Sequence, residues 1–333
     1  MSFKSIMVAS LCAMALFASC GTADANRTIV TEVPERPAGQ TDMLGFAAEP
    51  MDSVRIGVVG LGMRGADAAN RLTLVPGARV TAICDIDTAR INKVMARYAS
   101  RNYGPVATYG GDEESWKQLC EDPNVDLVYV VTDWKHHTPI ALYAMEQGKH
   151  TAIEVPAAST LEEIWDLINT SEKTRKHCMM LENCVYDFFE MNTLNMAQQG
   201  LFGEVLHTEG SYIHNLDEFW PAYANNWRLE FNKERRGDVY PTHGVGPACQ
   251  LLDIHRGDRM TTLVAMDTKA VNGPAAWKKM FGEEADTFAN GDHTMTMIRT
   301  ANGKTIQIQH DVVNPRPYSR MYQLTGTKGF ANK

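Results

Sequence analysis

The stretch VRIGVVGLGMRG at residues 54–65 carries the strongest fold signal in the chain. A run of apolar, largely β-branched residues leads into a Gly-x-Gly-x-x-Gly pattern, and a helix-like segment follows from about residue 64. This order of strand, glycine turn and helix is typical of the first βα unit of a dinucleotide-binding domain. It predicts a doubly wound α/β fold.

The residues of this turn predict a cofactor site. Gly60 permits a tight turn, Gly62 lets the backbone approach a pyrophosphate, and Gly65 allows close helix packing, with Met63 and Arg64 between them. Asp85 ends the next apolar run, 20 residues beyond Gly65, where a carboxylate accepts hydrogen bonds from the adenosine ribose and repels a 2′-phosphate. The pattern therefore predicts NAD rather than NADP. The alternative is a glycine turn that serves packing alone, with Asp85 as a helix cap.

Strand-like and helix-like segments alternate after residue 53. Strands are predicted at 54–60, 79–85, 106–110, 127–132, 150–155 and 178–183, with helices from 64 and at 87–100, 113–120, 138–147 and 160–174. Apolar β-branched runs separated by helices indicate parallel strands that are buried on both faces. We expect an NAD-binding Rossmann domain at residues 53–185.

The second half has a different pattern. Longer strands are predicted at 204–214, 261–270, 293–300, 305–313 and 321–326, with fewer helices. Alternating residues favour an open, largely antiparallel sheet with one face packed and one available to a ligand. We expect an α+β substrate domain at residues 186–333. We also expect it to be C-terminally truncated, because the sequence stops directly after the strand-and-turn signal LTGTKGF.

The N-terminal residues predict export. Lys4 precedes an apolar run at residues 6–17, and Ala18-Ser19-Cys20 closes it, so residues 1–20 resemble a signal peptide with a lipobox at Cys20. The run is too short for a transmembrane helix. We expect an exported protein of the bacterial cell envelope or periplasm, anchored by lipid at Cys20, with a soluble secreted protein as the alternative. The polar, Pro-punctuated residues 21–52 are predicted to be a linker or arm.

Composition excludes some partners. The 333 residues carry a formal charge of -8 without a Lys/Arg-rich block, so nucleic acid is not an expected partner. Seven cysteines occur without a CxxC pair, which argues against a zinc ribbon or a dense disulfide scaffold, and we expect no metal. The oligomeric state stays open, with a homodimer through the exposed face of the second sheet as one arrangement.

Two further strand ends are expected to line the nicotinamide side, since ligands of such sheets bind beyond the carboxyl ends of the strands. Trp134, Lys135, His136 and His137 follow the fourth predicted strand, and Glu154 and Val155 end the fifth. The alternative for Trp134 and the two histidines is helix capping and surface packing.

Several motifs together resemble the Gfo/Idh/MocA oxidoreductase superfamily and, within it, glycoside hydrolase family 109, the NAD-dependent α-N-acetylgalactosaminidases. They are RPAGQTDMLGF (36–46), GLGMRG (60–65), EVPAA (154–158), LENCVY (181–186), NNWRLE (225–230), RRGDVYPTHGVGP (235–247), NPRPYSR (314–320) and GTKGFANK (326–333). The resemblance implies a cofactor contact at Asn183. It implies a substrate site at Tyr212, Arg228, Tyr240, Pro241, Thr242, His243 and Tyr318.

Two departures from the redox members of that superfamily concern proton transfer. Those enzymes usually carry Glu-Lys-Pro after the fifth strand, and Val155 stands here in place of the proton-carrying lysine. They also tend to place an Asp four residues before a His, a region occupied here by Tyr240-Pro241-Thr242-His243. His243 and Tyr240 are therefore the expected catalytic residues, because imidazole titrates near neutral pH and a tyrosine beside positive charge can act as a base.

The resemblance implies hydrolysis of terminal α-N-acetylgalactosamine from glycans, with retention of configuration. Transient oxidation at C3 acidifies the C2 proton, the group on C1 is eliminated, water adds, and the hydride returns. Such a closed cycle suits an exported protein, because it consumes no free NAD. Two alternatives stay open: an envelope sugar oxidoreductase with tightly held NAD(P), and a non-catalytic glycan-binding lipoprotein.

Overall fold

A computed structural model describes residues 30–223 and 226–333. The expected signal peptide and Cys20 lie outside the described residues. Residues 30–39 contain neither helix nor strand and are exposed. Among the described residues, no helix is both long enough and apolar enough to cross a membrane.

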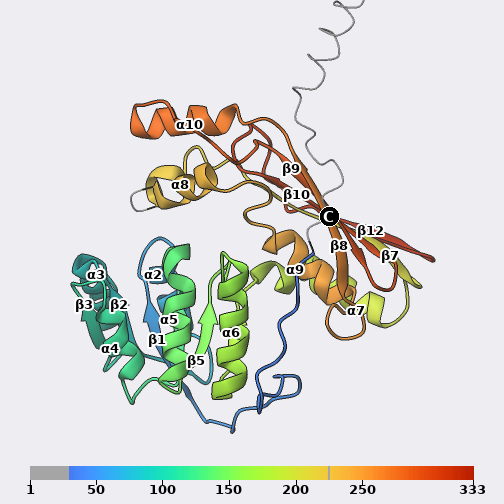
Figure 1. The fold of residues 1–333 in the computed structure, drawn as a ribbon. Coiled ribbons are helices and arrows are strands. Elements are labelled where there is room, and N and C mark those ends of the chain that lie inside the picture. The colour runs from blue at the N-terminus through green and yellow to red at the C-terminus, as the bar shows by residue number, and fades with distance from the viewer. Residues whose placement is uncertain (1–29, 224–225) are drawn as a thin grey trace, which may run out of the picture. The chain divides into compact units, whose positions relative to one another are not determined.

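The first sheet has six parallel strands in the order β3-β2-β1-β4-β5-β6, which is the order of a Rossmann fold (Figure 1). The strands are β1 (Val54–Val59), β2 (Ala78–Asp85), β3 (Ala107–Gly110), β4 (Leu127–Val130), β5 (His150–Ile153) and β6 (Cys178–Met180). The helices between them are α2 (Gly65–Leu72), α3 (Thr88–Ala99), α4 (Ser115–Glu121), α5 (Trp134–Glu146) and α6 (Leu161–Thr174). The doubly wound prediction is confirmed.

Two apolar clusters cover the faces of this sheet. One contains Leu119 of α4, Ile140 of α5 and Leu167 of α6, and the other contains Ala68 of α2 and Ile91 of α3. Helices therefore lie on both faces, which is why the strands are continuous apolar runs rather than alternating ones.

The second sheet is mixed, with the order β12-β11-β7-β10-β9-β8. Its strands are β7 (Val205–Ile213), β8 (Met260–Asp267), β9 (Thr294–Thr300), β10 (Thr305–Asp311), β11 (Tyr322–Gly326) and β12 (Phe330–Asn332). Four pairings are antiparallel and the pairing of β7 with β10 is parallel. The largely antiparallel prediction is thus confirmed, with a parallel pair at the centre of the sheet.

Short helices accompany this sheet: η1 (Asn183–Tyr186), α7 (Phe188–Gln198), η2 (Trp220–Ala222), α8 (Trp227–Glu234), α9 (Thr242–Leu251) and α10 (Asn272–Phe281). Helix α9 lies between the two sheets and packs on β7 (Figure 1). Gly210 of β7 and Gly244 of α9 make this approach possible, because a Cβ on Gly210 would lie 2.6 Å from the Gly244 Cα.

One face of the second sheet is buried and the other is open. Thr208, Gly210 and Tyr212 of β7 share the buried face with Ile308 and His310 of β10. Val264 and Met266 of β8 lie on the other face, opposite Met297 and Met295 of β9, and are exposed. The substrate-site residue Tyr212 therefore lies on the packed face, whereas the alternation alone had favoured the open face as the ligand side.

Part of the predicted arm is docked. Gln40 donates to the Asn169 carbonyl of α6, and Arg175, just after α6, donates to the carbonyls of Thr41 and Asp42 at 3.0 and 2.9 Å. The Arg175 guanidinium also stacks on the Phe46 ring at 4.7 Å. Residues 40–46 are thus held against the Rossmann domain.

Candidate active site

The glycine turn shows three different steric environments. Gly60 has φ +97°, and a Cβ there would lie 2.5 Å from the Val131 carbonyl oxygen. A Cβ on Gly65 would lie 1.9 Å from the Gly60 carbonyl oxygen, so this position requires glycine for backbone packing. Among the described residues, a Cβ on Gly62 would have only Arg90 Nη1 within 4 Å, at 3.6 Å. Packing does not require glycine at position 62, and the open space there fits a dinucleotide that approaches the backbone.

Asp85 fastens this turn to the end of β2. Its carboxylate accepts from the Leu61 N–H at 2.6 Å and from the Asp87 N–H at 2.8 Å, and it is 6% exposed. Arg90 Nη1 lies 3.7 Å from the same carboxylate. A carboxylate has about four acceptor positions, so these bonds leave room for the predicted ribose contact.

Arg64 and Glu154 connect the turn to the end of β5. Arg64 Nε donates to Glu154 Oε1 at 3.1 Å, and the Tyr129 hydroxyl donates to the same oxygen. Burial raises the pKa of Tyr129, and the Glu154 carboxylate raises it further, so the phenol keeps its proton. Met63 is exposed at the surface of the turn.

The residues after β4 form the first turn of α5, which begins at Trp134 rather than at the predicted residue 138. The reason is Asp133, whose side chain accepts from the N–H groups of Lys135 and His136 and so caps the helix. Asp133 also accepts from His136 Nδ1 at 2.8 Å, and this bond raises the pKa of the exposed His136. Lys135 is exposed beside it.

His137 is buried between two backbone carbonyls. Its Nδ1 lies 2.7 Å from the Pro156 oxygen and its Nε2 lies 3.2 Å from the Thr132 oxygen. Burial lowers the pKa of His137, so the ring is neutral and donates one hydrogen bond, which the shorter distance assigns to Pro156. The ring ties α5 to the loop after β5, beyond Val155.

Trp134 and Val155, which were expected at the nicotinamide, are 4% and 6% exposed and belong to the aromatic core next to the second sheet. Trp134 stacks on Tyr240 with ring centroids 5.4 Å apart and planes 9° apart. Val155 places a hydrocarbon among these rings, so no side chain at that position can carry a proton.

His243 and Glu182 form a buried pair. His243, the second residue of α9, places Nδ1 2.7 Å from Glu182 Oε1, and the two side chains are 5% and 6% exposed. Glu182 also accepts from the Cys184 N–H at 2.9 Å at the start of η1, next to Asn183. Burial raises the pKa of Glu182, but its bonds to His243, the Cys184 N–H and Thr242 outweigh burial and hold that pKa below its ordinary value.

The tautomer of His243 follows from this pairing. An ionised carboxylate only accepts, so Nδ1 carries the proton and Nε2 of the neutral ring is an acceptor. An imidazole oriented by a carboxylate in this way can accept a proton from a substrate. Pro241 and Thr242 begin the same helix and fix the position of His243.

Tyr240 lies in the middle of the aromatic residues. Its ring contacts Tyr212 at 4.9 Å and His243 edge-on at 5.0 Å. Burial raises the pKa of Tyr240 strongly, and the nearby Arg228 charge opposes this only in part. Tyr240 therefore keeps its proton where histidine titrates, which favours His243 over Tyr240 as the base.

Arg228 is buried inside a cage of four rings, Trp134, Tyr212, Tyr223 and Tyr240, whose centroids lie 4.8–5.8 Å from the guanidinium carbon. Its Nη1 donates to the Tyr223 hydroxyl at 2.6 Å and its Nη2 donates to the Tyr212 hydroxyl at 3.3 Å. The ring faces stabilise the charge, and the remaining N–H groups can bind a sugar oxygen. The last predicted substrate residue, Tyr318, is 54% exposed at the edge of this group.

A metal site was not predicted, although Glu182, Cys184 and His243 have ligand atoms within 4.8 Å of one another. Arg320 Nη1 donates to the Cys184 sulfur at 2.8 Å. The positive charge of Arg320 beside the Cys184 sulfur disfavours a metal cation there, and His243 Nδ1 and Glu182 Oε1 are hydrogen-bonded to each other. The group is better explained as a hydrogen-bonded cluster. Cys84, Cys120, Cys178, Cys184 and Cys249 are all free thiols.

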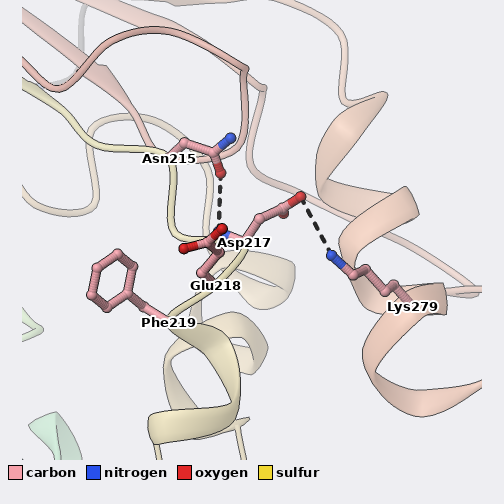
Figure 2. Close-up of a pocket in the computed structure, with 5 residues that line it drawn as sticks. All are labelled: Asn215, Asp217, Glu218, Phe219 and Lys279. Atoms are coloured by element: carbon pink, nitrogen blue, oxygen red, sulfur yellow. Dashed lines mark hydrogen bonds and ion pairs between the residues drawn. The ribbon is translucent and has the colours of Figure 1, made fainter.

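One pocket adjoins the start of α9, and another is lined by the segment after β7 and by α10. One of about 1260 Å³ has a mainly apolar lining from α6 and includes Pro241, Thr242 and Asp238. The other, of about 400 Å³, is lined by Asn215, Asp217, Glu218, Phe219 and Lys279, and Figure 2 shows the Asp217 carboxylate facing Lys279. None of the predicted site residues that the structure describes lines the second pocket.

Sequence reasoning missed Glu182 and His214. Glu182 lies in the quoted LENCVY motif directly after a strand, which is a position where ligand-binding residues gather, so a signal was present. His214 follows β7 and places Nδ1 3.0 Å from the Tyr212 hydroxyl. No residue pattern in the sequence indicates that the Tyr212 and His214 side chains form a hydrogen bond at the end of β7.

Both domains of the chain match models of known protein families. Residues 54–182 match the model of the oxidoreductase family with an NAD-binding Rossmann fold, so the first domain is NAD-binding as predicted. Residues 186–333 match the model of the glycosyl hydrolase 109 C-terminal domain. Among solved structures, an NAD binding oxidoreductase from Klebsiella pneumoniae is 20% identical with a TM-score of 0.66, covering 85% of this chain and 73% of that one. Myo-inositol dehydrogenase from Lactobacillus casei, crystallised with NAD(H) and myo-inositol, is 21% identical with a TM-score of 0.61, covering 84% and 74%. These two show the fold alone.

Curated relatives are much more similar in sequence. Glycosyl hydrolase family 109 protein 1 of Phocaeicola vulgatus is 67% identical over 301 residues, which cover 90% of this chain and 64% of that protein. The protein of the same name from Bacteroides fragilis is 61% identical over 322 residues, covering 96% and 69%. The chain thus spans about two thirds of the length of these relatives. With both of its domains matched and this degree of identity, the chain belongs to glycosyl hydrolase family 109.

Proposed function

We propose that the protein is an NAD-dependent glycosidase that releases terminal α-N-acetylgalactosamine from glycans with retention of configuration. Family membership supports a glycoside hydrolase with an NAD-binding domain. The observation that carries the mechanism is the buried Glu182–His243 pair beside Tyr212 and Tyr240. It supplies an oriented base in a site where Val155 replaces the lysine of the redox relatives.

NAD, when bound, supplies reversible hydride acceptance at C3 of the sugar. His243 Nε2 takes the proton from C2, while Glu182 holds the proton on Nδ1 and stabilises the imidazolium that forms. Tyr240 keeps its proton and serves as a donor to a sugar oxygen. Arg228 has five N–H groups, of which two are used by tyrosines, and it binds a hydroxyl or the acetamide carbonyl with the others.

Chromophore release from nitrophenyl α-N-acetylgalactosaminide tests this proposal. The NAD-loaded protein, extended to the length of its relatives, should release nitrophenol without net NADH accumulation and give the α-anomer first. In deuterated water, unreacted substrate or product should acquire deuterium at C2, and His243→Ala should abolish both exchange and release. Inactivity against a panel of α-galactosaminides would rule the proposal out.

The same assay separates the alternatives. An oxidoreductase would accumulate NADH in proportion to the sugar consumed. If the protein only binds glycans, the wild type and His243→Ala should bind the sugar equally well, and neither should release nitrophenol.

We also propose that the protein is exported and held in the cell envelope by lipid at Cys20. The leader pattern at residues 1–20 supports this proposal. Incorporation of labelled palmitate that is lost in Cys20→Ser tests it. An unlabelled protein found in the cytoplasm would contradict it.

A further inference from the structure

A chain of hydrogen bonds joins Arg228, Tyr212 and His214. Arg228 Nη2 lies 3.3 Å from the Tyr212 hydroxyl oxygen, and that oxygen lies 3.0 Å from His214 Nδ1. Tyr212 and His214 are two residues apart at the end of β7, so their side chains point to the same side of the strand.

The donor in each bond can be assigned. A guanidinium has only donors, so Tyr212 accepts from Arg228. Burial raises the pKa of Tyr212 despite the nearby Arg228 charge, so its hydroxyl keeps a proton to donate. The available acceptor is His214 Nδ1. A neutral imidazole has one N–H, and the proton of His214 therefore lies on Nε2.

His214 has surroundings opposite to those of His243. Burial lowers the pKa of His214, and the charges of Arg228 and Arg320 lower it further, so the ring is neutral. His243, in contrast, has a carboxylate at Nδ1. The Tyr212 ring lies 5.6 Å from His214 and 5.2 Å from His243. The two histidines in contact with this tyrosine thus present opposite free atoms, an acceptor on His243 and a donor on His214.

The position of His214 fits contact with substrate. It is half-buried, and its ring meets Tyr318 edge-on at 4.8 Å and Phe219 at 5.1 Å. Tyr318 and Phe219 are 54% and 40% exposed, so His214 lies where the buried aromatic residues reach solvent.

We propose that His214 is a substrate-contacting catalytic residue, whose Nε2–H donates a hydrogen bond to an oxygen of the bound sugar and is aimed by Tyr212 and Arg228. This proposal rests on the proposed function for the identity of the sugar. A neutral imidazole N–H can polarise a carbonyl oxygen without releasing its proton, and such a donor stabilises negative charge that develops when the neighbouring C–H bond is broken.

Nitrogen NMR of the NAD-loaded protein, labelled with ¹⁵N at histidine, tests the position of the His214 ring proton and requires no measurement of catalytic activity. The ring-nitrogen shifts of His214 should show an unprotonated Nδ1 and a protonated Nε2. Tyr212→Phe removes the donor and should release the proton to both nitrogens. Added N-acetylgalactosamine should shift the Nε2 signal. A proton on Nδ1 of His214, or an Nε2 signal that saturating sugar does not move, would overturn the proposal even in a protein without glycosidase activity.

Two substitutions at His214 then separate its two nitrogens. His214→Gln keeps a donor near the Nε2 position, whereas His214→Asn keeps polar atoms only near Nδ1. We expect kcat/KM to fall about threefold in His214→Gln and roughly tenfold or more in His214→Asn, as for loss of one hydrogen bond in the transition state. His207→Gln, on the opposite face of the same strand and bonded to Thr305, is the matched control. Equal losses in the Gln and Asn variants would contradict a role for the Nε2–H. Inactivity of the wild type on all glycosides would reject the proposed function and leave the NMR result to decide on His214.

Discussion

Alanine at Gly62 and at Gly65 should separate cofactor binding from folding. The two glycines lie three residues apart in one turn, and the substitution adds the same methyl group to each. At Gly65 the new Cβ would lie 1.9 Å from the Gly60 carbonyl oxygen, so the backbone of the turn must move by more than about 1 Å to reach van der Waals distance. At Gly62 the nearest atom is Arg90 Nη1 at 3.6 Å, which is an ordinary contact with a mobile side chain.

The sizes of the two effects follow from these distances. Overpacking against backbone costs about 1–3 kcal/mol or more, and for a domain of this size each kcal/mol lowers the melting temperature by about 2–4 °C. Gly65→Ala should therefore melt roughly 5–10 °C below the wild type. Gly62→Ala should keep the melting temperature or raise it slightly, because alanine reduces the entropy of the unfolded chain.

For NAD binding the order of the two variants should be reversed: Gly62→Ala should lose more NAD affinity than Gly65→Ala, although Gly65→Ala loses more stability. The methyl group at position 62 lies in the space through which a pyrophosphate approaches the backbone, and we expect a loss of affinity of at least tenfold, about 1.4 kcal/mol. Thermal unfolding of the apoprotein and calorimetric titration with NAD measure the two quantities separately. If Gly62→Ala bound NAD as tightly as the wild type, the assignment of this turn to the pyrophosphate would be refuted.

Three further substitutions test the site. Glu182→Gln should lower kcat roughly 10–100-fold, and at pH 7 it should cost about 1–2 kcal/mol of stability, because a charge-assisted bond to His243 becomes a neutral one. Because folding lowers the pKa of Glu182, the stability from its ionised form is present above pH 4.5 and is lost as the pH falls through the folded-state pKa. The denaturation curves of Glu182→Gln and the wild type should therefore converge in acid. Glu146→Gln, at an exposed position, is the control and should change neither kcat nor stability. Arg228→Met should lose activity yet melt within a few degrees of the wild type. A buried charge that is stabilised by aromatic rings rather than by a carboxylate contributes little net stability. A large fall in the melting temperature would contradict this estimate of the Arg228 contribution. Asp238→Asn should be more stable than the wild type at pH 8 but not at pH 3. Burial raises the pKa of Asp238 to about 7, so the wild type loses stability as the pH rises from about 4 through 7. A stability difference that stays constant across this pH range would show that the carboxyl group is not buried.

The strands of both sheets, apart from β12, and the helices of the Rossmann half could be predicted to within a few residues, whereas the helices of the second half could not be placed. Parallel strands buried on both faces leave uninterrupted apolar runs, which identify themselves without tertiary information. Helix α9 gives no such signal, since THGVGPACQL contains two glycines and a proline that normally disfavour a helix interior. Gly244 is needed there because β7 approaches the helix backbone too closely for any side chain. A helix whose sequence is chosen for a close contact cannot be distinguished from a loop without that contact.

The site shows the same division. His243, Tyr240 and Arg228 could be named from motifs, but their roles depend on partners far away in the sequence. Glu182 and His243 are separated by 61 residues and come from the two domains. The Arg228 cage takes Trp134 from α5 and Tyr212 from β7. Sequence spacing cannot give the proton positions on His243 and His214, because those positions are set by the groups that the other ring nitrogen meets.

The carboxylates of this site also bear on the mechanism. A glycosidase with two carboxyl groups needs one that is protonated as the acid and one that is free as nucleophile or base. Glu182 does not fit the acid, because its pKa is lowered and its Oε1 accepts from His243 and the Cys184 N–H. Glu154 accepts from both Tyr129 and Arg64. Asp238, the carboxyl with a raised pKa, accepts from the Tyr240 N–H and lines the apolar pocket with residues of α6. The groups whose rings or charge contact the Tyr212 ring are imidazoles, a phenol and a guanidinium, a set that can move a proton from carbon and stabilise charge on oxygen. This set fits the elimination route that we propose, which requires oxidation of the sugar beforehand.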